Sequence, residues 1–171
     1  MKNINHFIEN VINDQSISQK YADILFDDEA YLHKKFSGNI EESILLRLIK
    51  QSEDRVDLQI FLSALSQCLC REEVTVAVFD SLLHYKSRYR KSILIGLAHC
   101  HLSYYQLLAL NKAGIDEALF QLVDLFFKHS CFSEYDLKMI FLSRKGKIPR
   151  DFFESFSEKQ QELILSILKK A

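Results

Sequence analysis

Residues that make sharp turns are scarce in this chain. The sequence has four glycines and one proline among 171 residues, well below the average usage of about 7% and 5%. Sheets joined by tight turns depend on these two residue types. The scarcity therefore argues against a fold built from β-strands.

Long apolar runs are also missing. The longest stretches, such as Ile93–Leu97, are interrupted within a few residues by glycine, histidine or charge, whereas a membrane-spanning helix needs about 20 mostly apolar residues. The opening stretch MKNINHFIENVIND places Asn, Glu and Asp among its apolar positions, unlike the core of a signal peptide. We therefore expect a cytoplasmic protein that does not engage a membrane.

No charge of one sign dominates. Lys and Arg number 22 against 23 Asp and Glu, which gives a net charge of −1. No global field then selects nucleic acid or an anionic membrane. A hydrophobic content of 48% with 26% charged residues is ordinary for a folded domain.

Apolar residues recur at helical spacing throughout the chain. Ile44, Leu45, Leu48 and Ile49 form one stripe, as the positions i, i+1, i+4 and i+5 lie on one face of a helix. Similar stripes run through 56–65, 74–83, 93–102, 118–127, 137–142 and 163–168. The pattern predicts an all-α protein.

Side chains typical of helix ends support these assignments. Gly38 and Gly114 stand where a helix would end in a left-handed residue. Capping pairs, in which Ser or Asn precedes an acidic or amide residue by three positions, occur at Asn39 with Glu42, Ser133 with Asp136, and Ser157 with Gln160.

Helix pairs predicted from these signals begin near Asn39, Glu72, Ser103 and Ser133. Their spacing of about 30 residues is typical of helical repeats, although tetratricopeptide and ankyrin signatures are absent. We predict antiparallel helix pairs in a degenerate HEAT-like stack or an irregular bundle. We expect one domain over residues 1–171, with N-terminal helices in 1–37, the helix-pair stack in 39–144 and C-terminal helices in 148–171.

Metal and cofactor binding are not indicated. Cys68-Leu-Cys70 and His99-Cys100-His101 offer zinc-type donors, but residues two apart on a helix point to nearly opposite sides. The usual zinc spacing of two to four residues between cysteines is missing. We expect reduced, mostly buried cysteines at Cys68, Cys70, Cys100 and Cys131, no metal and no cofactor.

Catalytic motifs are absent as well. The chain contains no Gly-x-Ser-x-Gly, no His-Glu-x-x-His and no glycine-rich phosphate loop. A combination such as Cys131 with His129 is generic and dictates no chemistry. We therefore predict no catalytic residues and no enzymatic activity.

A basic aromatic segment lies between two predicted helices. Its side chains could follow a phosphate backbone while its tyrosine rings stack on bases. The alternative is a helix junction, in which Lys86 complements the end of one helix and residues 88–91 form the first turn of the next. The residues of the nucleic-acid alternative are Lys86, Arg88, Tyr89, Arg90 and Lys91.

Acidic clusters are more numerous, and most fall in predicted first turns. The helix dipole alone accounts for carboxylates there. In a stacked array, however, such turns would form one acidic surface that faces a basic partner. We name as candidate partner-binding residues Asp27, Asp28, Glu29, Glu53, Asp54, Asp57, Glu72, Glu73, Asp116 and Glu117, together with Tyr104 and Tyr105, which either anchor a partner or cover the core.

The short chain rich in Ile, Leu, Phe, Lys and Asn, the acid-headed helices such as Asn39-Ile-Glu-Glu42-Ser-Ile-Leu-Leu, and the lack of catalytic motifs resemble the helical immunity proteins of bacterial toxin systems, including contact-dependent inhibition. The resemblance implies a cytoplasmic protein that binds one cognate toxin, often a basic nuclease, and blocks its active site or substrate groove. The near-neutral net charge departs from the strongly acidic members.

Two other classes remain open. A HEAT-like adaptor or regulatory protein would present a broad groove to a housekeeping partner. A helical RNA-binding protein would gather its basic residues on one face. The oligomeric state and the identity of the partner do not follow from the sequence.

Overall fold

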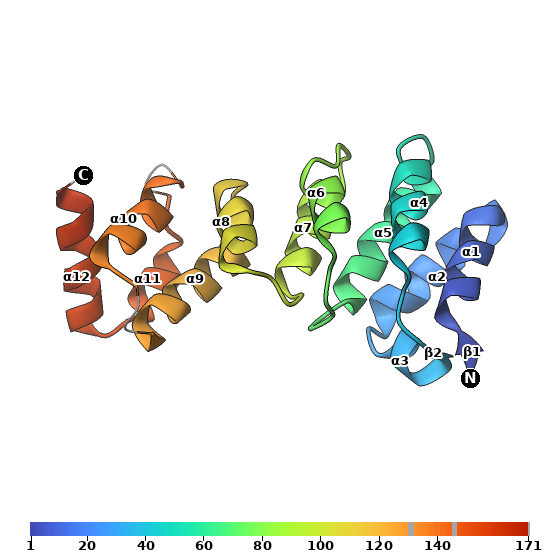
Figure 1. Cartoon of the computed structure of the whole chain (residues 1–171), viewed down its shortest axis with the longest axis horizontal. Helices are drawn as coiled ribbons and strands as arrows, with labels where there is room; N and C mark the ends of the chain where they lie inside the picture. The colour runs from blue at the N-terminus through green and yellow to red at the C-terminus, as the bar shows by residue number, and fades with distance from the viewer. Residues whose placement is uncertain (130–131, 145–146, 171) are drawn as a thin grey trace. The chain divides into compact units, whose positions relative to one another are not determined.

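The computed structural model describes residues 1–129, 132–144 and 147–170. Within these ranges the chain forms twelve helices and two strands of two residues each (Figure 1). The all-α prediction is confirmed. Contacts divide the chain into two compact units, Met1–Leu102 (unit 1) and Ser103–Ala171 (unit 2).

Unit 1 carries both strands and seven of the described helices. Its elements are β1 (Lys2–Asn3), α1 (Ile4–Asn13), α2 (Gln15–Asp27), α3 (Tyr31–Lys35), β2 (Phe36–Ser37), α4 (Glu42–Ser52), α5 (Val56–Cys68), α6 (Val76–Leu83) and α7 (Arg90–Ala98). The described helices of unit 2 are α8 (Tyr104–Lys112), α9 (Asp116–Lys128), α10 (Glu134–Leu142), α11 (Arg150–Glu154) and α12 (Glu158–Lys169).

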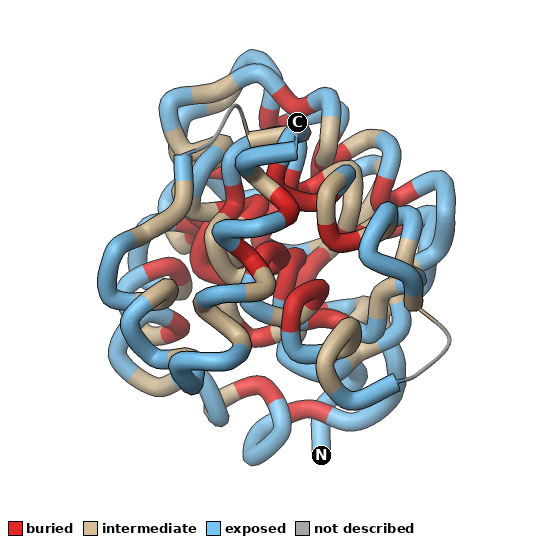
Figure 2. The backbone as a smooth tube through the Cα atoms, turned by 90° about the vertical axis from the view of Figure 1, so that its left-hand side faces the viewer, coloured by how far each residue is buried: buried red, intermediate tan, exposed pale blue. Residues whose placement is uncertain are grey.

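Helix α5 is the centre of unit 1, where it packs against α2, α4 and α7. Leu58, Phe61 and Leu65 on this helix are fully buried. Each such side chain stabilises the fold by about 1.5 to 3 kcal/mol relative to leaving it exposed. Buried segments of the helices face inward and exposed turns face outward (Figure 2), so the apolar stripes of the sequence form the core.

In unit 2, α8 packs on α9, α9 on α10, and α10 on α12. Leu110, Leu119 and Ile140 are fully buried there. Helix α11 contributes no buried residue. Its Phe152 packs against Phe120 of α9 with the two rings tilted, their centroids 4.3 Å apart.

Several predicted helix signals are confirmed. Ser133 and Ser157 form complete capping boxes at the starts of α10 and α12, and Gly114, which follows α8, has a φ of +90°. Gly38 also has a positive φ, +91°, but it follows β2, so its assignment to a helix end is wrong. The assignment of Asn39 as a cap is wrong. Helix α4 begins at Glu42 after Glu41, because the main chain at Asn39 and Glu41 is instead bound by the side chain of Asn5.

Three acidic clusters lie wholly or partly outside first turns, contrary to the prediction. Glu53 and Asp54 lie between the end of α4 and the start of α5, so only Asp57 of that cluster stands in a first turn. Asp27 is the last residue of α2, and Asp28 and Glu29 follow it. Glu72 and Glu73 lie in the loop that precedes α6. The single-domain boundaries and the HEAT-like stacking remain predictions. No helix in the described ranges is long and apolar enough to cross a bilayer.

Candidate functional site

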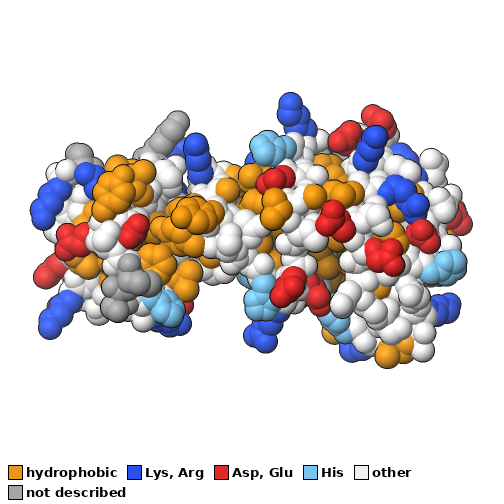
Figure 3. Space-filling model, in the orientation of Figure 1, with side chains coloured by type: hydrophobic (Ala, Val, Ile, Leu, Met, Phe, Trp, Pro, Cys, Tyr) orange, Lys and Arg blue, Asp and Glu red, His pale blue; other side chains and the backbone are white. Residues whose placement is uncertain are grey.

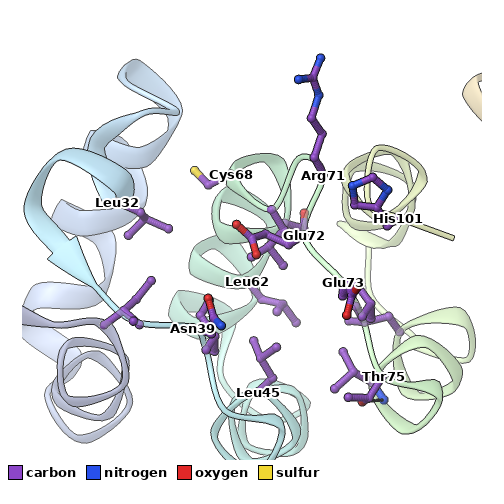
Figure 4. A pocket seen from close by; sticks show the side chains of 18 of the residues that line it. Leu32, Asn39, Leu45, Leu62, Cys68, Arg71, Glu72, Glu73, Thr75 and His101 are labelled. Atoms are coloured by element: carbon purple, nitrogen blue, oxygen red, sulfur yellow. Dashed lines mark hydrogen bonds between the residues drawn. The ribbon is translucent and has the colours of Figure 1, made fainter.

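A hollow of about 730 Å³ lies in unit 1, and we call it the groove (Figure 4). Its apolar floor comes from α4, α5 and α6, with Leu45, Leu62 and Val78 among the floor residues. One side, the first wall, consists of residues 36–40. The other side, the second wall, is the loop of residues 69–75. The two walls are brought together only by the packing of the helices between them.

The first wall is held in an extended conformation from the side of α1. β2 pairs in parallel with β1, with Lys2 opposite Phe36. Beyond the strand, Asn5 Nδ2 donates to the carbonyl oxygen of Asn39 at 3.0 Å, and Asn5 Oδ1 accepts from the backbone N–H of Glu41 at 2.8 Å. One amide side chain therefore fixes the course of the main chain along this wall.

The second wall is fixed by the segment that follows α7. The backbone N–H of Arg71 donates to the carbonyl oxygen of His99 at 2.9 Å, and that of His101 donates to Glu72 at 2.9 Å. Cys100 Sγ donates to the carbonyl oxygen of Leu69 at 3.2 Å. Arg71 has a φ of +67°, a conformation that costs a non-glycine residue about 1 to 2 kcal/mol. These contacts hold the loop in place in spite of that cost.

Two carboxylates stand at the second wall. Glu72 is half-buried and points over the apolar floor, while Glu73 is exposed and Arg71 points away from the groove (Figure 4). Neither carboxylate has an ion pair or a hydrogen bond within the described ranges. Acidic side chains lie beside a recessed apolar area on this face of unit 1 (Figure 3). The groove thus offers apolar surface together with two carboxylates that form no ion pair among the described residues, and His33, Arg71 and His101 line it as well.

Three of the other predicted acidic residues are already paired. Asp28 binds Lys34 at 3.0 Å, Asp57 binds Arg55 at 2.7 Å, and Asp116 binds Arg144. Glu53 lines a second hollow of unit 1 together with Lys50 and Lys86. The groove contains neither these four residues nor Asp27, Glu29, Asp54 and Glu117.

Asp57 illustrates how a first-turn carboxylate is used within the fold. Burial raises the pKa of this carboxyl group, but hydrogen bonds from Arg55 and Ser18 and the positive charge of Arg55 outweigh that effect. The pKa of Asp57 consequently lies below its ordinary value. Arg55 Nη1 also donates to the carbonyl oxygen of Ile12 at 2.5 Å, so the network ties α5 to α1 and α2.

The two tyrosines predicted at the start of α8 differ in their surroundings. Tyr104 is half-buried and packs against Phe132, with the ring centroids 5.2 Å apart. Tyr105 is 79% exposed. Tyr104 therefore contributes to the packing of unit 2, and Tyr105 is open to solvent in that unit.

The basic aromatic segment is engaged in joining α6 to α7. Tyr85 is buried, and its hydroxyl lies 2.7 Å from Ser52 Oγ. Arg90 donates to the carbonyl oxygen of Leu83 at 2.8 Å, and the guanidinium of Arg88 lies over the ring of Tyr89. Lys86 and Lys91 are exposed. The buried ring of Tyr85 therefore has no free face on which a base could stack. Of the candidate nucleic-acid residues, Arg88 and Tyr89 contact each other.

The two buried thiols, Cys68 and Cys100, are poor nucleophiles. Burial, with smaller effects from Glu29 and Asp28, raises the pKa of Cys68 to about 11. Burial, with smaller effects from Cys70 and Glu72, raises that of Cys100 to about 12. Cys70 is exposed, and Cys131 lies outside the described residues. The described side chains contain no cluster of three or more His, Cys, Asp or Glu suited to a metal ion.

Sequence reasoning identified Glu72 and Glu73 but missed the groove that they border. The apolar residues Leu45 and Leu62 were read as ordinary core positions of helices. Ile40 and Asn39 were read as part of a helix start. The only local signal was Gly38, whose left-handed conformation was foreseen but was attributed to a helix end.

Comparison with known proteins gives no match for this chain: no protein family fits it, and no curated protein or solved structure shows significant similarity.

Proposed function

We propose that this protein works by binding another polypeptide, and that the partner is a cognate bacterial toxin domain whose activity the complex blocks. The observation that supports this proposal is the groove of unit 1, which combines an apolar floor with the unpaired carboxylates of Glu72 and Glu73. Apolar surface and carboxylates without an ion pair in one concave site favour an occupant that is both apolar and basic.

The charges and the floor contribute differently to such a complex. Carboxylates at the rim accelerate association with a basic surface. Burial of the apolar floor, worth about 25 cal/mol for each Å² removed from water, slows dissociation. Because the net charge is only −1, the attraction is local to the groove and does not come from the molecule as a whole.

In this proposal the toxin is inhibited because its substrate-binding surface is occupied by the groove. A toxin whose basic surface holds its substrate loses access to that substrate when the same surface lies on Glu72 and Glu73. We place the encounter in the cytoplasm, where an immunity protein meets an incoming toxin. No catalytic step and no cofactor belong to this mechanism.

Affinity copurification from the native host, with washing at moderate salt, tests the proposal. We expect one stoichiometric protein that mass spectrometry identifies as a toxin domain. Growth of cells that express this domain should then be restored by coexpression of the chain. A housekeeping complex would replace the proposal with the adaptor class, recovery of RNA would replace it with the nucleic-acid class, and failure to restore growth would also refute it.

A further inference from the structure

We infer that the groove receives an extended segment of the partner, in which a Lys or Arg side chain is flanked by aliphatic ones, and that this segment pairs with the main chain of Ile40 while its cation meets Glu72. The inference rests on the proposed function and names the part of the partner that unit 1 recognises.

The main chain at Ile40 is prepared for pairing with a strand. Asn5 holds the carbonyl oxygen of Asn39 and the backbone N–H of Glu41 on its own side. The described chain has no cis peptide bond, and in a trans peptide the C=O and the following N–H point in opposite directions. Both the N–H and the C=O of Ile40 therefore point away from Asn5.

These two groups belong to a residue of the first wall and have no partner among the described residues. Ile40 lines the groove, and none of the backbone hydrogen bonds of the described residues involves its N–H or its C=O. An extended peptide that joins the edge of a strand forms hydrogen bonds to the N–H and the C=O of the same residue, which point to the same side. Within a helical ligand the main-chain groups are already bonded to each other, and its free N–H and C=O groups lie at opposite ends, so the geometry favours an extended occupant.

The second wall supplies the negative charge that the cation of the partner segment would meet. Glu72 accepts from the backbone N–H of His101 through its carbonyl oxygen, so the N–H of Glu73 points away from the main chain of His101. The side of this wall that carries the carboxylates borders the groove, which His101 also lines. The half-buried carboxylate of Glu72 lies over the apolar floor. Lys and Arg bury their aliphatic stems along apolar surface and place the charged head at its edge, which fits this arrangement.

Nuclear magnetic resonance titration tests the inference without knowledge of the natural partner. The probe is the synthetic peptide acetyl-Val-Leu-Lys-Leu-Val-amide, added to millimolar concentration to the whole ¹⁵N-labelled chain. We expect shifts confined to the amides of the two walls, with a binding constant that weakens about two- to fivefold in Glu72→Gln. The matched control Glu162→Gln, an exposed carboxylate of α12 in unit 2, should leave the constant unchanged.

Altered versions of the peptide distinguish the contribution of its main chain to binding from that of its charge. A peptide methylated on the N atom of the lysine, and one with Glu in place of Lys, should both bind more weakly than the parent. Equal affinity of hexylamine would reassign the groove to small amines and overturn the inference. Shifts elsewhere on the chain, no binding at millimolar peptide, or equal affinity of the altered peptides would overturn it as well.

The outcomes for the two proposals are distinguishable. A captured toxin domain that binds Glu72→Gln and the unaltered chain equally well would leave the proposed function in place and refute the groove as its site. Specific binding of the lysine peptide without any captured toxin would retain the extended-segment site and remove the toxin as its occupant.

Discussion

Gly96 of α7 lies against Ser66 of α5 so closely that a Cβ atom added to the glycine would come within 2.6 Å of the Ser66 carbonyl carbon and oxygen. Backbone atoms form this contact, so no side-chain rotation can relieve it. The close approach of α7 to α5 fixes where the chain after α7 meets the second wall of the groove.

Replacement of this glycine should therefore destabilise unit 1. We expect Gly96→Ala to lower the free energy of unfolding by about 1 to 3 kcal/mol, the usual cost of forcing extra volume into a packed core. Urea unfolding followed by far-ultraviolet circular dichroism measures the change. Lys91→Ala, an exposed substitution on the same helix, should stay within about 0.5 kcal/mol of the unaltered chain; an equal loss in both variants would contradict the prediction.

Unit 2 has a comparable dependence on Asn111, which is fully buried on α8. Its Nδ2 donates to the carbonyl oxygen of Ile140 at 2.9 Å and to Ser143 Oγ at 2.8 Å. We expect Asn111→Ala to cost about 1 to 3 kcal/mol, because buried polar partners lose their hydrogen bonds. The neighbouring substitution Lys112→Ala, at an exposed position, is the control. Stability equal to that of this control would show that the amide contributes nothing.

The Asp57 network predicts a particular dependence on pH. The folded-state pKa of Asp57 lies below that of the unfolded chain, so its stabilisation is present above about pH 4, the ordinary range of an aspartate, and is lost as the pH falls through the folded-state value. Asp57→Asn should be less stable than the unaltered chain at pH 6, and the difference should shrink by pH 3. Urea titrations at both pH values measure it; a difference that does not change with pH would refute this role.

Arg71 offers a substitution that relieves strain. Its φ of +67° is costly for any residue with a Cβ but not for glycine. We expect Arg71→Gly to gain up to about 1 kcal/mol in the free energy of unfolding after the added flexibility of the unfolded chain is counted. Arg71→Ala keeps the Cβ and should show no gain. A loss in the glycine variant would mean that the arginine side chain itself holds the loop.

Features that depend on neighbours in the sequence could be predicted. The stripe of Ile44 and Leu48 and the cap at Ser133 report on local helix geometry, and both are confirmed. The role of Asn39 was misjudged, because Asn5, far away in the sequence, binds the main chain there. The groove was not foreseeable for the same reason, since its two walls meet only when α4, α5 and α6 have packed.

The availability of the acidic side chains could not be predicted from the sequence either. The sequence singled out both Asp57 and Glu72 as candidates, but only the structure shows that Arg55 pairs with the first and that the second has no ion pair among the described residues. A carboxylate's availability depends on which cation the fold brings to it. Charge counts along the chain do not contain that information.

The most direct measurement compares the affinity of the captured toxin domain for two double variants of equal net charge. Glu72→Gln with Glu73→Gln removes the carboxylates of the groove, and Glu158→Gln with Glu162→Gln removes two exposed carboxylates of α12. Isothermal titration at low and high salt should show about a tenfold loss for the first pair at low salt, a smaller loss at high salt, and no loss for the second pair. Equal affinities of the two variants would contradict the claim that the groove of unit 1 binds the partner.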